Sequence, residues 1–460
     1  MKRTLAEFAR LAGGRLAGAD RAYTDVVSDS RTLKAGQLFI ALRGPSFDGH
    51  DFVAAAAAAG AAGALVERAQ PVELPQIVVA DTQAALERAA HAWRADFGGA
   101  LVGVAGSNGK TTAKEMTAAI LGQAGPCLAT RGNLNNHIGV PLTLLRLTGA
   151  ERFAVVEMGA NRAGEVAHLV EVARPTVGLI TNAGAEHLEG FGSLEGVARA
   201  EGEMVAGLAP SATAVINADD AFAPLWRSCT PARVVTFGVR ADADFRASEM
   251  QAAVGSEGFT TSFHLTAPIG AAAIRLSLGG GHNVANALAA AAAAASAGAA
   301  LEHIVAGLAA VRAVPGRLQF RRAASGGWLI DDSYNANPSS VRAAIEVLAT
   351  LPGRRWLVLG DMAELGTFAA EEHAGIGELA RRAGVERLYA TGVLMQRATA
   401  AFGAGAEWFA DVPTLIAALR AALGSTAAEV RILIKGSRFN RLERVVEALA
   451  AAPSAGTGGH

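Results

Sequence analysis

Residues 101–112 read LVGVAGSNGKTT, and this stretch decides the fold of the middle of the chain. A short apolar run that ends in glycine and leads directly into a helix-forming run is typical of a buried parallel strand. AVVEMGA (154–160), TVGLITNAG (176–184) and ATAVINADD (212–220) repeat this shape. The repetition predicts a doubly wound α/β domain, whose ligands bind at the carboxyl ends of the strands.

The sequence on either side of this centre predicts two further α/β domains. Residues 1–85 alternate short apolar strands (37–41, 64–66, 77–79) with helical stretches such as 51–59. Residues 242–278 alternate in the manner of an antiparallel edge. A new strand–helix series follows residue 317, with WLIDD, RWLVLGD, RLYATG and VRILIKGS as its strands. We therefore expect domains at 1–85, 86–317 and 318–450, followed by a flexible tail at 451–460.

The composition excludes several classes of protein. The chain has 460 residues, 51% of them hydrophobic, and a formal net charge of −1, which excludes disorder as the main state. The balanced charge predicts no nucleic-acid partner and no anionic membrane surface. Two cysteines give no disulfide framework. The uncharged, Ala-rich run at 284–301 predicts a buried helix rather than a membrane span, and charges interrupt the N-terminal segment. We expect a soluble cytoplasmic protein with no membrane insertion.

The glycine-rich segment after the first central strand predicts a phosphate-binding loop. Its residues are Gly106, Ser107, Asn108, Gly109, Lys110, Thr111 and Thr112. Glycines let backbone N–H groups surround phosphate oxygens, and the helix N-terminus favours an anion. Lys110 would reach the β- and γ-phosphates, and the Thr111 hydroxyl would bind Mg²⁺. The spacing does not match the general GxxxxGK[ST] pattern, so a glycine turn that binds nothing is the alternative. The context of strand, loop and helix favours ATP.

Several motifs together resemble one known family. They are GSNGKTT (106–112), GNLNNHIGVPLTLL (132–145), VEMGANRAGE (156–165), TNAGAEHLEGFGSLEGVA (181–198), GGGHNVANALAA (279–290), DDSYNANP (331–338) and LGDMAELG (359–366). With DSR at 29–31 and FDGHDF at 47–52, they resemble the Mur ligases, the ATP-dependent amide ligases of peptidoglycan precursor synthesis. The resemblance is collinear from about residue 29 to residue 438. It implies an N-terminal UDP-binding domain, a central ATPase domain and a C-terminal Rossmann-like domain.

Within this family the motifs look most like those of members that join D-alanyl-D-alanine to UDP-N-acetylmuramoyl-tripeptide. The resemblance implies an acyl phosphate intermediate, ATP and two Mg²⁺ ions as cofactors, and small-molecule substrates. We also expect a monomer. Two alternatives stay open. A sister ligase that adds a single amino acid would usually carry a DNPR-type motif in the third domain, which this sequence lacks. A nucleotide switch that ligates nothing would not need the front motifs or the complete third domain.

The resemblance also implies the metal ligands. Glu157 ends a buried strand, where an unpaired carboxylate is costly, and it is expected to bind Mg²⁺. A helix-capping role is the alternative for this residue. His187 is expected to bind a second Mg²⁺, although imidazole is an unusual ligand for a hard cation. Glu201 stands where many family members carry a carbamylated lysine, and it is expected to support the same ion. The alternative for Glu201 is a solvated helix face beside Glu203.

The remaining roles concern ATP and the two substrates. Asn286 is expected at the adenine, although a capping or buried, internally bonded Asn is the alternative from spacing alone. The resemblance places Arg317 at the phosphates or ribose and Asp332 at the ribose. Substrate contacts are expected from Ser30, Arg31, Asn135, Asn136, Tyr334, Asn335, Asn337 and Lys435. For the Lys435 segment, a solvated basic turn is an equally good interpretation of the sequence.

Overall fold

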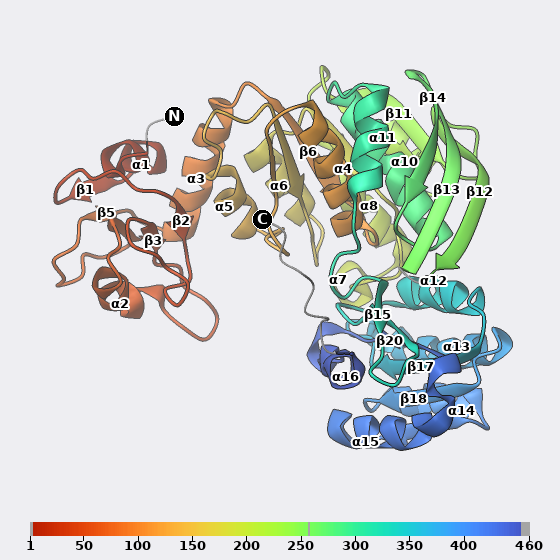
Figure 1. The fold of residues 1–460 in the computed structure, drawn as a ribbon. Helices are drawn as coiled ribbons and strands as arrows, with labels where there is room; N and C mark the ends of the chain where they lie inside the picture. The colour runs from red at the N-terminus through yellow and green to blue at the C-terminus, as the bar shows by residue number, and fades with distance from the viewer. Residues whose placement is uncertain (1–2, 256–257, 452–460) are drawn as a thin grey trace, which may run out of the picture.

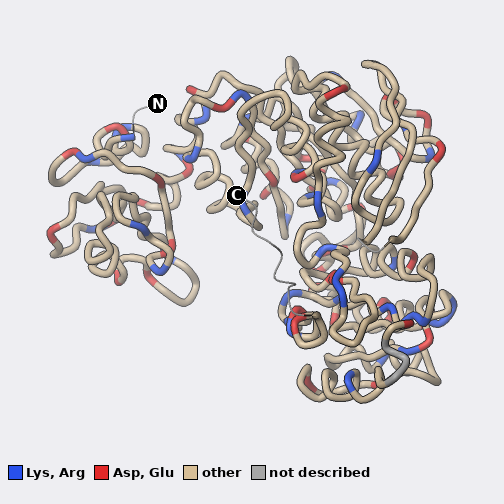
Figure 2. The backbone as a smooth tube through the Cα atoms, in the orientation of Figure 1, with Lys and Arg blue, Asp and Glu red and all other residues tan. Residues whose placement is uncertain are grey.

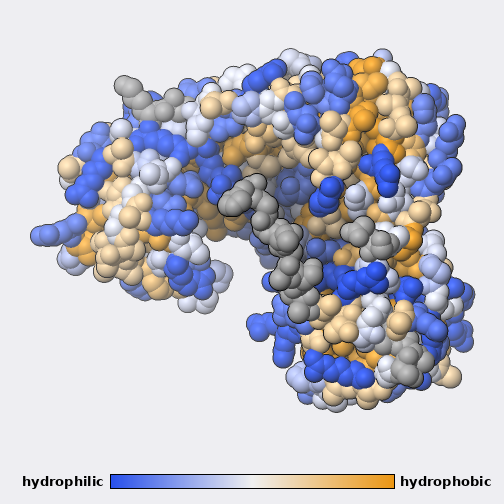
Figure 3. Space-filling model, in the orientation of Figure 1, coloured by the Kyte–Doolittle hydropathy of each residue, from blue (hydrophilic) through white to orange (hydrophobic). Residues whose placement is uncertain are grey.

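Three α/β domains follow one another along the chain (Figure 1). The computed structural model describes residues 3–255 and 258–451. The N-terminal domain lies to one side of the central domain, and the C-terminal domain lies below it. With all atoms drawn, the surface is deeply hollowed between the N-terminal and C-terminal domains (Figure 3). Of the predicted tail at 451–460, residues 452–460 lie outside the described part of the chain.

The N-terminal domain is a five-stranded sheet with helices around it. Its strands are β1 (Arg15–Ala17), β2 (Val26–Val27), β3 (Leu38–Ile40), β4 (Gly63–Val66) and β5 (Gln76–Val78), in the order β1-β5-β4-β3-β2. The predicted strands at 37–41, 64–66 and 77–79 are confirmed. The stretch predicted as a helix at 51–59 is a short 3-10 helix, η1 (Gly49–Phe52), that continues into α2 (Val53–Ala58). Helix α1 (Leu5–Ala12) precedes the sheet and buries Leu5 and Phe8.

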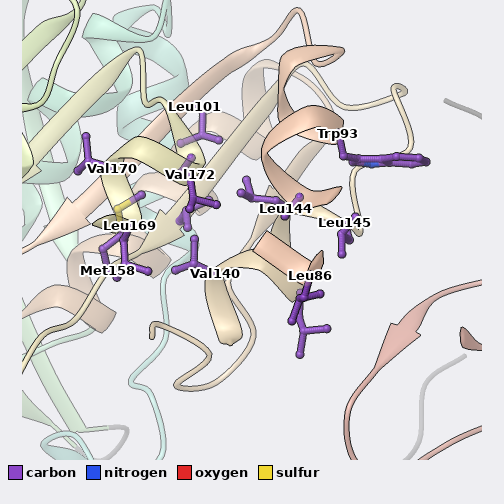
Figure 4. Close-up of a cluster of buried hydrophobic side chains, with 14 of the residues drawn as sticks. Leu86, Trp93, Leu101, Val140, Leu144, Leu145, Met158, Leu169, Val170 and Val172 are labelled. Carbon is purple, nitrogen blue, oxygen red and sulfur yellow. The ribbon is translucent and has the colours of Figure 1, made fainter. Parts of the chain in front are cut away.

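Helix α3 (Thr82–Ala95) joins the N-terminal and central domains through shared packing. It packs on α1 and also on α5 (Gly139–Leu144) and α6 (Glu165–Ala173). Figure 4 shows Leu86 and Trp93 of α3 beside Leu144 and Leu145 of the α5 segment, within one continuous cluster of buried side chains. The boundary predicted at residue 85 falls inside this helix. A cut there would expose apolar surface on both sides.

The central domain is built on a nine-stranded sheet with a switch in strand order at β6 (Ala100–Ala105). The order is β14-β13-β12-β11-β10-β9-β6-β8-β7. The parallel part contains β6, β7 (Cys127–Ala129), β8 (Phe153–Glu157), β9 (Val177–Ile180), β10 (Thr213–Asn217) and β11 (Arg233–Gly238). β6 lies between β9 and β8, so the loop after β6 opens at the switch point, where α/β sheets bind ligands.

The antiparallel edge predicted over 242–278 is confirmed. It consists of β12 (Phe245–Gly255), β13 (Gly258–Ala267) and β14 (Gly270–Leu276), which pair antiparallel with one another. The central helices are α4 (Lys110–Ala124), α5, α6, α7 (Leu188–Phe191), α8 (Leu194–Ala206), α9 (Ala223–Cys229), α10 (Gly281–Ser296) and α11 (Leu301–Ala310). The Ala-rich α10 is packed between α4, α11 and the sheet, so its alanines are buried by protein. Of the helices in the described ranges, none is long and apolar enough to cross a membrane.

The C-terminal domain is a six-stranded sheet in the order β15-β16-β20-β17-β18-β19. Its strands are β15 (Gln319–Arg322), β16 (Trp328–Asp332), β17 (Arg354–Gly360), β18 (Arg387–Thr391), β19 (Ala406–Phe409) and β20 (Val430–Lys435), and its main helices are α12 (Pro338–Ala349), α13 (Ala369–Arg382), α14 (Met395–Phe402), α15 (Val412–Leu423) and α16 (Glu443–Leu449). Short 3-10 turns η2 (Gly366–Phe368), η3 (Gly424–Glu429) and η4 (Arg438–Asn440) connect them. Only β15 pairs antiparallel among these described strands. The fold of this domain confirms the Rossmann-like prediction.

Charged residues of both signs are spread over all three domains (Figure 2). This mixture agrees with the net charge of −1.

Candidate active site

A cleft of about 660 Å³ lies between the carboxyl ends of the central strands and the C-terminal domain. Its size falls in the ordinary range of small-molecule sites. Most of the predicted site residues line it: Ser107, Asn108, Gly109, Lys110, Thr111, Thr112, Asn135, Asn136, Glu157, His187, Asn286, Arg317, Asp332, Tyr334, Asn335, Asn337 and Lys435. The cleft lining does not include Gly106 or Glu201, nor Ser30 and Arg31 of the N-terminal domain.

The phosphate loop is held from behind by the end of strand β9. The Ser107 amide donates to the backbone oxygen of Asn182 at 2.8 Å, and the Asn108 amide donates to the Asn182 side-chain oxygen at 3.0 Å. The Thr181 hydroxyl donates to the Asn108 carbonyl at 2.7 Å. The sequence interpretation missed Asn182 as a loop-holding residue, although its position at the end of the neighbouring strand is the available signal. By their position in the first turn of α4, the amides from Gly109 onward have no intrahelical acceptor, so they can bind an anion.

Lys110 lies folded over its own loop. Its ammonium donates to the Gly106 carbonyl, to the Ser107 carbonyl at 3.2 Å and to the Glu186 carboxylate at 3.4 Å. Burial acts to lower the pKa of Lys110, but the carboxylates of Glu186, Glu201 and Glu157 outweigh it and raise that pKa. The lysine is therefore positively charged at neutral pH. Glu186, which lines the cleft, is a second residue that sequence reasoning missed.

Glu157 is buried at the end of β8 and offers a free carboxylate oxygen. Its Oε1 accepts from Asn135 Nδ2 at 2.9 Å. Its Oε2 is buried, with no hydrogen-bond partner among the described residues. The capping alternative is wrong, because Gly164 is the N-cap of α6. An unsatisfied buried carboxylate oxygen suits a hard cation, so Glu157 fits the predicted Mg²⁺ role.

His187 meets Glu364 across the boundary between the central and C-terminal domains. Its Nδ1 lies in direct contact with Glu364 Oε2. Both residues have left-handed backbones, with φ of 48° and 61°, which is uncommon for residues other than glycine. Glu364 belongs to the LGDMAELG motif but was not assigned a role from sequence. In the described part of the chain, no three His, Cys, Asp or Glu side chains converge as a metal site. The metal roles of His187 and Glu201 stay predictions.

Glu201 lies beneath the phosphate loop. Its side chain is 2% exposed, so the alternative of a solvated helix face is wrong. Burial raises the pKa of Glu201 to about 7, against the opposing effect of Lys110. Its Oε2 accepts a hydrogen bond from the Gly106 amide at 2.7 Å.

Asn283 and Asn286 lie at the start of α10, and Asn286 packs against Gly109 of the phosphate loop. Asn283 Nδ2 donates to the Gly279 carbonyl at 2.8 Å, and Asn286 Nδ2 donates to Asn283 Oδ1 at 3.1 Å. A Cβ atom on Gly109 would lie 2.3 Å from Asn286 Oδ1, and Gly109 has φ of 81°. Gly109 therefore has both a steric and a conformational reason to be glycine. His282, also in the cleft lining, has its pKa lowered by burial.

Asp332 and Lys435 form a buried pair on adjacent strands. They are register partners of β16 and β20, and Lys435 Nζ lies 2.6 Å from Asp332 Oδ2. Lys435 also donates to the Asn335 carbonyl at 2.9 Å. The prediction of a solvated basic turn is wrong for Lys435, which is buried. Its positive charge is already paired within the protein.

Arg317 bridges the domain hinge and the phosphate loop. Its Nη2 donates to Thr111 Oγ1 at 3.1 Å, and its guanidinium lies 4.4 Å from the centre of the Tyr334 ring. This position beside the loop agrees with the predicted contact to ATP. Asn136, by contrast, uses its side-chain oxygen to accept the Ile138 and Gly139 amides at the start of α5.

The DSR segment lies apart, in the N-terminal domain. Arg31 forms a bidentate pair with Asp29, with Nη2 at 2.8 Å from Oδ2, and its side chain is exposed. The Arg31 hydrogen bond lowers the pKa of Asp29. In the FDGHDF motif, His50 is buried, lies against Asp48 at 2.6 Å and accepts the Glu67 amide at 2.8 Å. Burial and pairing make this His a structural support of its loop.

A strand, a phosphate loop and a helix at the switch point of a parallel sheet define a phosphate-loop nucleotide-binding protein. The chain belongs to the Mur ligase family. Three family models match it: "Mur ligase family, catalytic domain" over residues 22–96, "Mur ligase middle domain" over 104–294 and "Mur ligase, glutamate ligase domain" over 316–438.

Individual relatives match almost the whole chain. The chain is 46% identical over 448 residues to the UDP-N-acetylmuramoyl-tripeptide–D-alanyl-D-alanine ligase of Escherichia coli K12, covering 97% of this chain and 98% of that one. A crystal structure of MurF from Acinetobacter baumannii matches with a TM-score of 0.90 and 34% identity over 97% and 98% of the two chains. MurF ligase of Thermotoga maritima in complex with ADP matches with a TM-score of 0.78 and 28% identity over 92% and 96%.

Proposed function

We propose that the chain is an ATP-dependent ligase that joins D-alanyl-D-alanine to UDP-N-acetylmuramoyl-tripeptide and so forms the pentapeptide precursor of peptidoglycan. The observation that carries this function is the 46% identity, over 97% of the chain, to a relative with this activity in its name. The cleft supports it, because a phosphate loop faces a second α/β domain there. The reaction forms an amide between a carboxylate and an amine, which requires an activated carboxylate.

In this reaction the terminal carboxylate of the tripeptide attacks the γ-phosphate of ATP, giving an acyl phosphate and ADP. The amine of D-alanyl-D-alanine then adds to the acyl carbon, and phosphate leaves from the tetrahedral intermediate. Lys110 and the amides at the start of α4 stabilise the negative charge of the transferring phosphoryl group. Arg317, held on Thr111, places a second cation at the same loop.

Glu157 is the best-supported ligand for a divalent cation. Its orphaned Oε2 and the Thr111 hydroxyl both belong to the cleft lining, and both are hard oxygen donors. Mg²⁺ bound there would neutralise phosphate charge during transfer. A second Mg²⁺ at His187 is part of the same proposal.

The shape of the molecule supports a long substrate. The hollow between the N-terminal and C-terminal domains is bordered by the central domain (Figure 3). A substrate with a uridine end and a peptide end can bind the N-terminal domain through Ser30 and Arg31 while its carboxylate reaches the cleft. Asn135, Tyr334, Asn335 and Asn337 line the cleft, and the proposal assigns them contacts with the carboxylate and the dipeptide. A monomer in the cytoplasm is part of the proposal.

One assay tests the function against its nearest alternative. Phosphate release is measured with each UDP-muramoyl peptide crossed against D-alanyl-D-alanine and against single amino acids, and the products are identified by mass spectrometry. Release that requires both the UDP-tripeptide and the dipeptide is the expected result. Release with a shorter UDP-peptide and one amino acid would make the chain a sister ligase. Release without either substrate would favour a nucleotide switch.

A further inference from the structure

Glu201 makes a contact that a metal-ligand role does not explain. It lies in α8, 2% exposed and outside the cleft lining, and its Oε2 accepts the Gly106 amide at 2.7 Å. This hydrogen bond joins residues 95 positions apart in the sequence and is itself buried. A buried amide needs an acceptor, and Glu201 is the acceptor that this loop uses.

The residue whose amide Glu201 accepts, Gly106, also binds Lys110 through the carbonyl of its next peptide. The Gly106 amide faces Glu201, and the Gly106 carbonyl on the other side accepts from Lys110 Nζ. Gly106 has φ of 122°, and a Cβ atom there would lie 2.1 Å from Thr181 Oγ1. Position 106 therefore requires glycine, and a rotation of its peptides would displace the carbonyl that accepts from Lys110.

The Glu201 bond completes a set of anchors behind the loop. Asn182 accepts the next two amides, from Ser107 and Asn108. The first three loop amides thus point into the protein, and those at the start of α4 point toward the cleft. This division preorganises the donors for phosphate, which lowers the reorganisation needed on binding.

We propose that Glu201 is a positioning residue of the phosphate loop, which acts by accepting the Gly106 amide and so fixing Lys110 in the place where it meets the nucleotide phosphates. What this role requires is an acceptor oxygen at the end of the side chain. It deepens the proposed function, since it concerns the ATP site of the same reaction, but nucleotide binding tests it without any ligation.

Two variants of nearly equal size separate the acceptor role from a metal role. Glu201→Gln keeps an acceptor oxygen and loses the carboxylate charge. Glu201→Met keeps the length of the side chain but loses both the acceptor oxygen and the charge. Glu195→Gln, at an exposed site on the same helix, is the matched control. The readouts are the affinity for ADP in the presence of EDTA, the Mg²⁺ concentration for half-maximal activity, and amide exchange of the 101–110 segment.

We expect Glu201→Gln to bind ADP within about threefold of wild type, with unchanged loop protection and Mg²⁺ requirement, because the hydrogen bond survives. Glu201→Met should bind ADP about tenfold or more weakly and exchange faster in the loop, since a buried donor loses its partner. If the Glu201→Met variant fails to fold, the Glu201→Gln variant still separates the acceptor role from a metal-ligand role. Normal metal-free ADP binding with a raised Mg²⁺ requirement in Glu201→Gln would overturn the proposal in favour of a metal ligand. Equal ADP binding by wild type and a folded Met variant would also overturn it.

Discussion

Asn337, at the start of the C-terminal helix α12, donates a hydrogen bond of 2.9 Å to the side-chain oxygen of Asn108 in the phosphate loop. Asn108 in turn donates to the hydroxyl of Ser339 at 2.9 Å. Asn337 is also the N-cap of α12, where its side-chain oxygen accepts the Ser340 amide at 2.8 Å. The C-terminal domain is therefore docked directly on the loop that would hold the phosphates of ATP.

Replacing Asn108 by Ala should weaken this docking and slow the reaction. Two hydrogen bonds between the domains would be lost, each contributing about 1 kcal/mol net, so kcat/KM for ATP should fall by about tenfold or more. Ser339→Ala removes one of the two and should show a smaller loss. Steady-state phosphate release at varied ATP measures both. Wild-type kinetics in Asn108→Ala would mean that the contact has no part in catalysis.

Lys110→Ala should abolish ligation while leaving the loop backbone in place. The variant loses an ammonium group that the protein keeps protonated. Such a group stabilises the transition state by several kcal/mol, which corresponds to a rate factor on the order of a thousandfold. Single-turnover ligation by the purified, folded variant is the measurement. A rate within tenfold of wild type would show that the phosphate-loop assignment is wrong.

The sequence was sufficient for the residues that sit inside continuous motifs. The strand before Gly106 and the helix after Lys110 identify a phosphate loop by local pattern alone, and the buried strand that ends at Glu157 places its carboxylate at the same sheet edge. The three-domain organisation follows in the same way, since each domain repeats a strand–helix period. The boundary at residue 85 could not be found from sequence, because α3 is apolar toward both domains.

The residues that were missed act through contacts distant in sequence. Asn182 holds the phosphate loop from a neighbouring strand, and Glu364 reaches His187 from another domain. Such pairs depend on strand order and domain docking, which a local pattern does not encode. Lys435 was ambiguous for the same reason, since its partner Asp332 lies on a strand that is adjacent in the sheet but distant in the chain.

The Asp332–Lys435 pair should be strongly coupled in stability. Lys435→Met would leave the Asp332 carboxylate buried without its cation, which costs about 3–5 kcal/mol in comparable buried pairs. Asp332→Asn combined with Lys435→Met should be much less destabilised than the sum of the two single variants. Urea unfolding of all four proteins in a double-mutant cycle gives the coupling. Additive losses would mean that the pair contributes little.

Ser30 and Arg31 should control recognition of the uridine end. Arg31 is exposed, and its guanidinium offers several hydrogen-bond donors in one plane, which suits a diphosphate. In this structure the guanidinium is paired with Asp29. The double variant Ser30→Ala, Arg31→Ala should raise the Kd for the UDP-tripeptide by about tenfold or more while ADP binding stays normal. Isothermal titration calorimetry with each ligand measures both. Unchanged UDP-tripeptide affinity would remove these residues from the substrate site.

His373 should make the C-terminal domain sensitive to acid. Its side chain is fully buried, its Nε2 accepts the Met362 amide at 3.0 Å, and its Nδ1 lies 2.6 Å from the Ala369 carbonyl. These contacts require the neutral ring. Burial lowers the pKa of His373, against the opposing effects of the Ala369 carbonyl and of the Asp361 and Glu372 carboxylates.

The sign of this effect follows from proton linkage. Below about pH 6.5 the unfolded chain binds a proton at His373 that the folded chain excludes, so the stability present above that pH is lost as the pH falls. Wild type should therefore lose more stability between about pH 7.5 and about pH 5.5 than a His373→Gln variant does, although that variant is less stable at the higher pH. Amide exchange of residues 360–373 at both pH values reports on this site specifically, and His137→Gln, at an exposed position, is the control. Equal losses in wild type and His373→Gln would show that protonation of this ring does not limit the stability of the domain in acid.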